Sequence, residues 1–380
     1  MIAPEVVDIV EEYFHGKYKV EQFLESSEFA EIYIVRHVFL DDLRVMKIIK
    51  EPFDINSNLN FLLYGARLAC KLKHENIIDI NDAGIIPAGD KNENDWVYFI
   101  MEYVLGGDLT PYMMSFKESN ILMPIFWGLS LIKQILLGLN KLHSSQPPIV
   151  HNDLKPSNIL LSFNSEYRIV VKISDFGFSR EINSNMDNHI IVGTRQYMAP
   201  ECFKNKYYPS TDIYALGVVF YILLTNHFPY DMDRFNLAEI IDGKPWKSHL
   251  IPPSNYNNNV SPLIDEIVSK CLQADYNNRF LNAGELLTEI EKCFRKSYLH
   301  LNENDYGMNN AMKKAFRLAK YENNFSEAKV ILKDYDMGEI FEKVMNFDKE
   351  QNSFLSQTIK LKTSHNIKSK EDDFLEEQKK

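Results

Sequence analysis

The sequence predicts an α+β protein in which a small β-rich region is followed by a larger helical region. Runs rich in Ile and Val, separated by turn residues, alternate in the strand pattern between residues 18 and 103. From residue 121 onward, apolar residues instead recur at helical spacing. A cleft between two such regions is a natural site for a ligand.

The β-rich region contains a β-like stretch, one helix and two further strand-like runs. Residues 18–50 are β-like, with one turn before Ile32 and a second turn at Asp41-Asp42, so that Lys47 belongs to the third expected strand. Residues 57–73 read as a helix with Leu62, Ala66, Ala69 and Leu72 on one stripe. Two further strand-like runs follow at residues 77–86 and 96–103.

The helical region starts with a long apolar-periodic segment, Ile121 to His143. Ala215 to Thr225 is almost wholly apolar, which predicts a buried central helix. After residue 295 the pattern changes. Residues 296–350 suggest a helix–turn–helix extension that packs on the main domain or on a partner, and residues 351–380 form a polar tail that we expect to be flexible.

Composition excludes several classes of protein. The chain has 42 Lys and Arg against 53 Asp and Glu, a net charge of −11. This balance argues against a dedicated nucleic-acid binder, which needs a basic face. The longest apolar run, Gly217 to Leu224, is shorter than the ~20 residues of a membrane span. We therefore expect neither nucleic acid nor membrane as a partner.

Four scattered cysteines have no metal-ligand spacing and read as buried, reduced thiols (Cys70, Cys202, Cys271 and Cys293). Reduced thiols fit a reducing compartment. The acidic N-terminus also lacks the basic start of a signal peptide. A cytoplasmic protein is expected.

The most specific chemical pattern is His151-Asn-Asp-Leu-Lys-Pro-Ser-Asn158. Its Asp, Lys and Asn can converge in one loop. Asp153 could orient a hydroxyl nucleophile, Lys155 could neutralise a transferring phosphoryl group, and the amide oxygen of Asn158 could bind a metal. Asp175-Phe-Gly adds a second carboxylate that suits Mg²⁺, and Lys47 ends an earlier strand-like run.

These residues resemble the signature set of the eukaryotic-type serine/threonine protein kinase family. The resemblance covers residues 17–295 and continues through Gly193-Thr-Arg-Gln-Tyr-Met-Ala-Pro-Glu201, Asp212 and Arg279. It implies a two-lobed protein kinase fold, with a small antiparallel β-rich N-lobe and a larger helical C-lobe, followed by the helical C-terminal extension. It also implies that Glu201 pairs with Arg279 and that Asp212 holds the backbone of the 151–158 loop.

The resemblance further implies a site for ATP and Mg²⁺. Lys47 would contact the phosphates, Asn158 and Asp175 would hold the metal, and Asp153 and Lys155 would be catalytic. His151 would stack under the Phe176 ring. Other nucleotide contacts are implied for residues of the first strands, of the segment joining the lobes and of the strand after the catalytic loop: Ser27, Ala30, Ile32, Val45, Met101, Glu102, Val104, Asp108 and Leu160.

The type of acceptor follows from the same comparison. In this family, a Lys at position 155 together with Thr194 goes with serine or threonine acceptors, whereas tyrosine kinases carry an Arg/Ala arrangement. Aminoglycoside-type phosphotransferases share the catalytic loop but lack the Ala-Pro-Glu segment, which counts against a small-molecule acceptor.

Three departures from the family pattern stand out. The glycine-rich loop reads Glu25-Ser-Ser-Glu-Phe-Ala30. Gly65 occupies the helix position where a Glu should pair with Lys47. Lys47 is therefore expected to turn to Asp175 or to Glu28, and Asp175 is favoured because its place beside the cleft is fixed by the chain. Asn152 replaces the Arg that would grip a phosphate on the activation loop.

The sequence therefore predicts an ATP-dependent serine/threonine protein kinase that does not depend on activation-loop phosphorylation. The alternative is a pseudokinase or ATP-binding scaffold that acts through protein interactions. Either could use the helical extension to bind a protein partner.

Overall fold

The computed structural model describes residues 4–26, 30–50, 67, 70, 72–89, 95–104, 106–163, 169–181 and 194–300. The chain divides into two compact units. The first comprises residues 1–113 and 121–302. Of the second, residues 114–120 and 303–380, only residues 114–120 are described. The predicted tail and nearly all of the predicted extension lie outside the described residues, so their assignment stays a prediction.

The N-lobe is built on a five-stranded sheet with strand order β1-β2-β3-β5-β4, in which every neighbouring pair is antiparallel. This is the sheet that the strand-like runs predict. One helix precedes it. Within the described residues, the elements of the lobe are α1 (Pro4–Tyr13), β1 (Tyr18–Ser26), β2 (Ala30–His37), β3 (Asp42–Ile49), β4 (Ile80–Ile86) and β5 (Trp96–Glu102).

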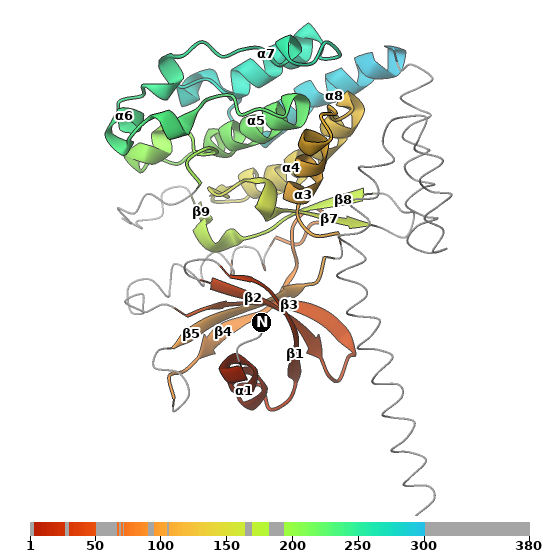
Figure 1. Cartoon of the computed structure of the whole chain (residues 1–380), viewed down its shortest axis with the longest axis vertical. Coiled ribbons are helices and arrows are strands. Elements are labelled where there is room, and N and C mark those ends of the chain that lie inside the picture. Colours follow the sequence, from red (N-terminus) through yellow and green to blue (C-terminus); the bar gives the residue numbers. More distant parts are fainter. Residues whose placement is uncertain are drawn as a thin grey trace, which may run out of the picture. The chain divides into compact units, whose positions relative to one another are not determined.

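Side chains alternate between the two faces of this sheet. On one face, Met46, Ile48 and Ile100 form a buried cluster with Val6 and Val10 of α1. Figure 1 shows α1 on the side of the sheet away from the helical region. The residues between them in sequence, including Lys47, must point to the other face. The covering of one face by α1 therefore leaves the opposite face for the functional groups.

The C-lobe is mostly helical, as predicted, and two short sheets join it (Figure 1). The helix α4 carries ten buried residues and packs against α5 and α8. Its elements are α3 (Leu109–Glu118), α4 (Ile125–His143), β6 (Ile149–Val150), β7 (Ile159–Phe163), β8 (Ile169–Ile173), β9 (Arg180–Glu181), α5 (Pro209–Thr225), α6 (Leu237–Ile241), α7 (Pro262–Cys271) and α8 (Ala283–His300).

Several predicted boundaries shift in the structure. The helix expected from residue 121 begins at Ile125, directly after Pro124, and the helix expected from residue 215 begins earlier, at Pro209. In both cases a Pro marks the start, because it lacks the N–H that a helix interior needs. The strand expected at residues 77–86 begins at Ile80. Of the helix predicted at 57–73, only residues 67 and 70 are described as helical.

Two expectations about surface and burial can be compared with the structure. Among the described helices, α4 alone is long and apolar enough to cross a membrane, and half of its most apolar stretch is buried inside the protein.

All four cysteines are free, but Cys70 is exposed, so the prediction that all are buried is wrong for this residue. A lone Cys carries no pattern that distinguishes a core position from a surface one.

Candidate active site

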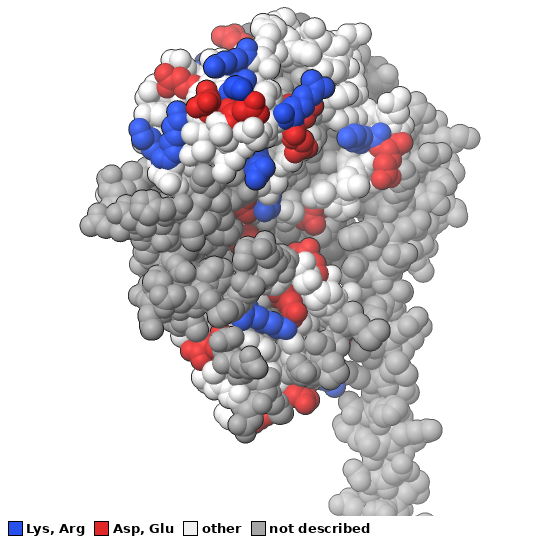
Figure 2. Space-filling view, turned by 60° about the vertical axis from the view of Figure 1, so that its left-hand side comes forward, with Lys and Arg blue, Asp and Glu red and all other residues white. Residues whose placement is uncertain are grey.

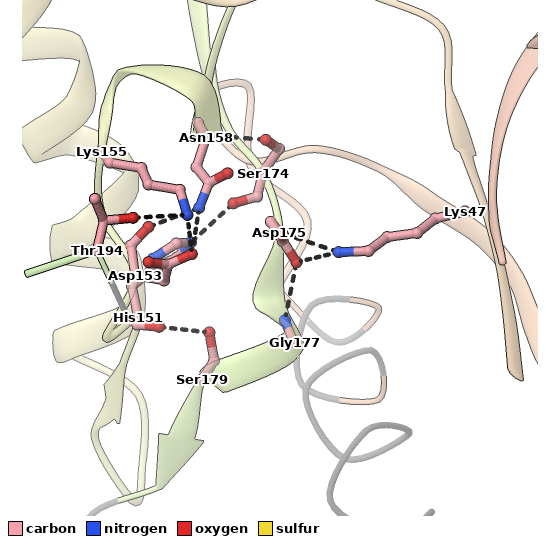
Figure 3. Close-up of polar contacts among 10 residues, drawn as sticks. All are labelled: Lys47, His151, Asp153, Lys155, Asn158, Ser174, Asp175, Gly177, Ser179 and Thr194. Atoms are coloured by element: carbon pink, nitrogen blue, oxygen red, sulfur yellow. Dashed lines mark hydrogen bonds and ion pairs between the residues drawn. The ribbon is translucent and has the colours of Figure 1, made fainter. Parts of the chain in front are cut away.

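The loop between β6 and β7 brings together the three residues that the sequence marks as chemical groups (Figure 3). Asp153 Oδ2 accepts hydrogen bonds from Lys155 Nζ at 2.8 Å and from Asn158 Nδ2 at 2.9 Å. Asn158 Nδ2 also donates to the backbone carbonyl of Asp153 at 2.7 Å. Asp153 and Asn158 are each only 6% exposed. The predicted convergence of this Asp, Lys and Asn is therefore present.

Asp212 of α5 holds the backbone of this loop and is fully buried. Its carboxylate accepts from the backbone N–H of His151 at 2.8 Å and from that of Asn152 at 2.9 Å. The expectation that Asp212 holds the loop is confirmed. Charge-assisted hydrogen bonds to a buried carboxylate are strong, so they fix the loop firmly.

His143 extends this network and was not singled out from the sequence. The Ala283 backbone N–H donates to His143 Nδ1 at 3.0 Å, so Nδ1 must carry the lone pair. The proton then lies on Nε2, which donates to Asp212 at 3.0 Å. These partners lie 69 and 140 residues away in sequence, so no local signal reveals them.

A second buried ion pair fixes the segment that follows Thr194. Glu201 and Arg279 form two parallel hydrogen bonds, of 2.7 and 2.8 Å, and are 4% and 2% exposed. Thr211 Oγ1 also donates to Glu201 at 2.9 Å, and Arg279 donates to the Ser210 carbonyl at 3.1 Å. The expected Glu201–Arg279 pair is confirmed, and its hydrogen-bonding capacity is well satisfied.

Lys155 links the catalytic loop to this segment. Its Nζ donates to Thr194 Oγ1 at 3.3 Å while it pairs with Asp153. Figure 3 shows the Lys155 ammonium between the two side chains. The residues after Thr194 therefore start beside the Asp153 carboxylate.

On the opposite side of the site, Lys47 of β3 reaches Asp175, which follows β8 (Figure 3). Lys47 Nζ donates to both carboxylate oxygens, at 2.8 and 2.9 Å. Asp175 has a left-handed backbone (φ 61°), a region that Asp and Asn enter more easily than most residues, and it also accepts from the Gly177 N–H at 3.4 Å. Asp175 is thus the described partner of Lys47, as the missing helix carboxylate suggested.

Two opposing effects act on the protonation of Asp175. Burial raises its pKa, but the Lys47 ammonium and its hydrogen bonds outweigh burial and hold the pKa below the ordinary value. The stabilisation from this pair is therefore present at neutral pH and is lost only as the pH falls through the lowered pKa. Near neutrality, a competing cation or anion can separate the pair, whereas a small change of pH cannot.

His151 contacts the Phe176 ring, as expected, but the two rings meet edge to face and are not stacked. Their centroids lie 5.1 Å apart. His151 Nε2 donates to the Ser174 carbonyl at 2.9 Å, and Ser179 Oγ donates to the His151 carbonyl at 3.3 Å. These contacts join the catalytic loop to the segment that carries Asp175.

The expected nucleotide contacts of the N-lobe share one face of the sheet. Val45 lies opposite Met101 on β5, and Ile32 lies opposite Lys47 on β2. Ala30 belongs to the same alternating set on β2 and is 8% exposed. The sheet therefore presents these five residues on the face that α1 does not cover.

The remaining expected contacts lie on the segment after β5 and on β7. Asp108 pairs with Leu160 in an isolated β-bridge, which sets β7 beside that segment. Asp108 Oδ1 accepts from the Thr110 N–H at 2.7 Å, which orients the carboxylate that is expected to contact the nucleotide. Val104 is buried at this segment.

The side chain of Glu102 has a role that the sequence did not reveal. Glu102 Oε1 accepts from Lys172 Nζ on β8 and from the Asp79 N–H, both at 2.8 Å. This side chain ties β5 to the C-lobe. The expected nucleotide contact of Glu102 uses its backbone carbonyl and is compatible with this arrangement.

Two departures from the family pattern, the altered glycine-rich loop and the missing helix Glu, fall partly or wholly outside the described residues. Ser27 and Gly65 are not described, so their expected roles stay predictions. Glu25, at the end of β1, is exposed and lies opposite Ile32. Its carboxylate can therefore turn to water, which limits repulsion of a bound phosphate.

Asn158 and Asp175 fit the magnesium role that the family implies. The Asn158 amide nitrogen is used by Asp153, which leaves the amide oxygen for another partner. Asp175 offers carboxylate oxygens that already hold a cation, the Lys47 ammonium. Amide and carboxylate oxygens are hard ligands of the kind Mg²⁺ takes. Among the described residues, no separate cluster of three or more His, Cys, Asp or Glu could hold a metal.

Comparison with known proteins agrees with this geometry. Relatives include a probable serine/threonine-protein kinase of Clostridium perfringens, 28% identical over 282 residues, which are 73% of this chain and 38% of that protein. Serine/threonine-protein kinase PrkC of Bacillus subtilis is 28% identical over 313 residues, 81% of this chain and 45% of PrkC. Mitogen-activated protein kinase kinase 2 of Arabidopsis thaliana is 35% identical over 205 residues, 51% of this chain and 52% of that protein.

The chain thus spans about half of the length of these relatives or less. The family model of the protein kinase domain matches residues 18–299 of this chain. The matched segment begins at the start of β1 and ends in α8. This match confirms the fold class and the family that the sequence motifs indicate: the chain belongs to the protein kinase family.

Proposed function

We propose that the chain is an ATP-dependent serine/threonine protein kinase that transfers the γ-phosphate of ATP to hydroxyl groups of protein substrates. The convergence of Asp153, Lys155 and Asn158 in one loop, with Thr194 beside it, carries this proposal. The names of the relatives support the same chemistry.

On the acceptor side, Asp153 orients the attacking hydroxyl and accepts its proton. Its carboxylate is held in place by Asn158 and Lys155, so little reorganisation is needed when the acceptor arrives. Lys155 places a positive charge beside the site of transfer, where it stabilises the charge on the migrating phosphoryl group.

On the donor side, Lys47 contacts the phosphates of ATP, and Asn158 and Asp175 hold Mg²⁺. When bound, Mg²⁺ neutralises charge on the phosphate oxygens. Lys47 and Asp175 satisfy each other in the structure, so each must exchange its partner when nucleotide binds. Both side chains are partly exposed, Lys47 by 18% and Asp175 by 27%. Water therefore screens their attraction, and the free energy needed to separate the pair is small.

Preference for serine and threonine is supported by the contact between Lys155 and Thr194. Independence from activation-loop phosphorylation is supported by Asn152, whose neutral amide cannot form a bidentate ion pair with phosphate as an Arg does. Asn152 has a left-handed backbone (φ 68°), a conformation that suits Asn. Its backbone is bound to Asp212 without the help of a phosphate.

The alternative, an ATP-binding scaffold without transfer activity, is favoured by one observation. Lys47 occupies both oxygens of Asp175, the residue that would hold the metal. Under either function, a cytoplasmic location agrees with the four free cysteines, and the helical extension is the proposed place for a protein partner.

The test is Mg²⁺-dependent incorporation of phosphate from ATP into protein, with Asp153→Ala as the blank. Asp242→Ala changes an exposed aspartate of the same lobe and serves as the matched control. We expect incorporation by the wild type and by the control, and none by Asp153→Ala. Binding of ATP by the wild type with no incorporation above the blank would favour the scaffold.

A further inference from the structure

The turn formed by residues 194–198 lies beside the acceptor site and is held tightly. Its backbone closes through hydrogen bonds from Tyr197 N to Thr194 O at 2.9 Å and from Met198 N to Arg195 O at 3.3 Å. Thr194 Oγ1 lies 3.3 Å from Lys155 Nζ, which in turn lies 2.8 Å from Asp153. The turn therefore begins within two contacts of the catalytic carboxylate.

Almost every side chain of this turn has a partner within the chain. Gln196 donates to Asp233 at 3.1 Å, the Tyr197 ring meets the Phe228 ring at 5.7 Å, and Met198 is 5% exposed. Thr194 is occupied by Lys155. These contacts fix the turn without using the Arg195 side chain.

Arg195 is the exception. It is exposed, and its guanidinium has no ion pair or hydrogen bond within the part of the chain that the structure describes. Asp233, an acidic side chain near this turn, is bound to Gln196 instead. A free cation therefore stands next to Thr194, on a backbone held in one place.

We propose that Arg195 selects protein substrates that carry an anionic group close to the accepting hydroxyl. The anion is a carboxylate of Asp or Glu or the phosphate of an already phosphorylated side chain. A guanidinium binds either of them through two parallel hydrogen bonds. This inference rests on the proposed kinase function and names the substrate class of the same site.

The surroundings favour a local contact over a general attraction. Figure 2 shows acidic and basic side chains interspersed on the visible face of the helical region, without a broad field of one sign. The net charge of −11 would repel acidic substrates at a distance. A single exposed cation next to Thr194 fits this surface better than attraction by the whole protein does, and Arg195 is such a cation.

The experiment uses the full chain and labelled peptides with one serine, in which Glu, phosphoserine, Ala or Lys is moved through the two positions on each side. Dissociation constants are measured by fluorescence anisotropy and transfer by kcat/KM, for wild type and Arg195→Gln. Lys204→Gln, which removes another exposed cation of the same lobe, is the matched control.

For the best position, we expect wild type to bind the Glu peptide about five-fold more tightly than the Ala peptide, and the phosphoserine peptide roughly ten-fold or more. Arg195→Gln should lose most of this preference, whereas Lys204→Gln should keep it. The Glu and phosphoserine arms show which anion the site takes.

The two readouts separate the inference from the proposed function. Transfer to all peptides without anionic preference, or a preference that survives in Arg195→Gln, overturns the role of Arg195 and leaves the kinase function standing. Binding that depends on Arg195 with no transfer to any peptide supports the role of Arg195 as a docking residue and overturns the kinase function.

Discussion

In the proposed function, the loop around Asp153 is the acceptor side of the site and the Lys47–Asp175 pair is the donor side, and these two sides are built in opposite ways. On the acceptor side, Asp212 is 0% exposed and bound to two backbone N–H groups and a histidine, and Glu201 and Arg279 are buried together. On the donor side, one partly exposed ion pair, Lys47–Asp175, joins the N-lobe to the segment after β8. The first arrangement fixes a geometry, and the second can be exchanged for a ligand.

This contrast has an energetic basis. Removing one partner of a buried pair leaves an uncompensated charge, which costs about 3–5 kcal/mol. A partly exposed pair contributes about 0–1 kcal/mol, because water screens both charges. Substitutions on the acceptor side should therefore lower the stability of the protein, whereas substitutions on the donor side should weaken ligand binding.

The largest expected effect on stability follows substitution of the buried pair. Glu201→Gln leaves Arg279 without its counter-charge and should lower the free energy of unfolding by about 3–5 kcal/mol. Glu289→Gln, which breaks a more exposed pair with Lys292, is the control and should change it by less than about 1 kcal/mol. The free energy of unfolding is measured by thermal or denaturant unfolding. If both variants lose the same amount, the buried pair is no more important for stability than the exposed one.

The N-lobe should owe its stability to apolar packing more than to its ion pair. Ile9 of α1 is 6% exposed against the sheet, so Ile9→Ala should cost about 2–5 kcal/mol. Val7→Ala, at a partly buried position of the same helix, should cost less. If Ile9→Ala unfolds at the same denaturant concentration as wild type, α1 does not support the sheet.

The donor-side pair should show the reverse behaviour. Lys47→Met should change the free energy of unfolding by less than about 1 kcal/mol. It should weaken ATP binding roughly ten-fold or more, because a charged hydrogen-bond donor to phosphate is lost. Calorimetric titration with ATP and Mg²⁺ measures the affinity. A large loss of stability with unchanged affinity would reverse the assignment.

The smallest effect is expected on phosphatase treatment. Asn152 cannot grip a phosphate, and Asp212 already holds the loop, so activity should be unchanged after dephosphorylation. Phosphate incorporation by treated and untreated enzyme provides the measurement. Loss of activity that returns on rephosphorylation would show that the loop needs a phosphate after all.

The sequence predicted local chemistry well. Asp153, Lys155 and Asn158 lie within six residues, and a loop of this length has few ways to arrange them. The pairing of Lys47 with Asp175 was the favoured of two predictions, because the helix segment expected to supply a carboxylate contains none. The other candidate, Glu28, lies outside the described residues. The strands were found because one alternating face had to be buried.

Long-range contacts could not be predicted in the same way. His143 ends a helix with no motif around it, and its partners are distant in sequence. The helix α1 was not predicted from the sequence, and only the folded structure shows that its apolar residues cover one face of the sheet. The bond between Glu102 and Lys172 joins two strands of different lobes, which neither strand pattern specifies.

The most direct test of the central claim, that a prebuilt acceptor side works beside an exchangeable donor side, is Asp153→Asn. Phosphate incorporation and the dissociation constant of ATP are measured in parallel for wild type and variant. In the proposed function Asp153 acts on the acceptor hydroxyl, so transfer should fall by about 10²–10⁴-fold, while ATP affinity should stay nearly unchanged. Equal loss of transfer and of ATP affinity would contradict the division of the site into these two parts.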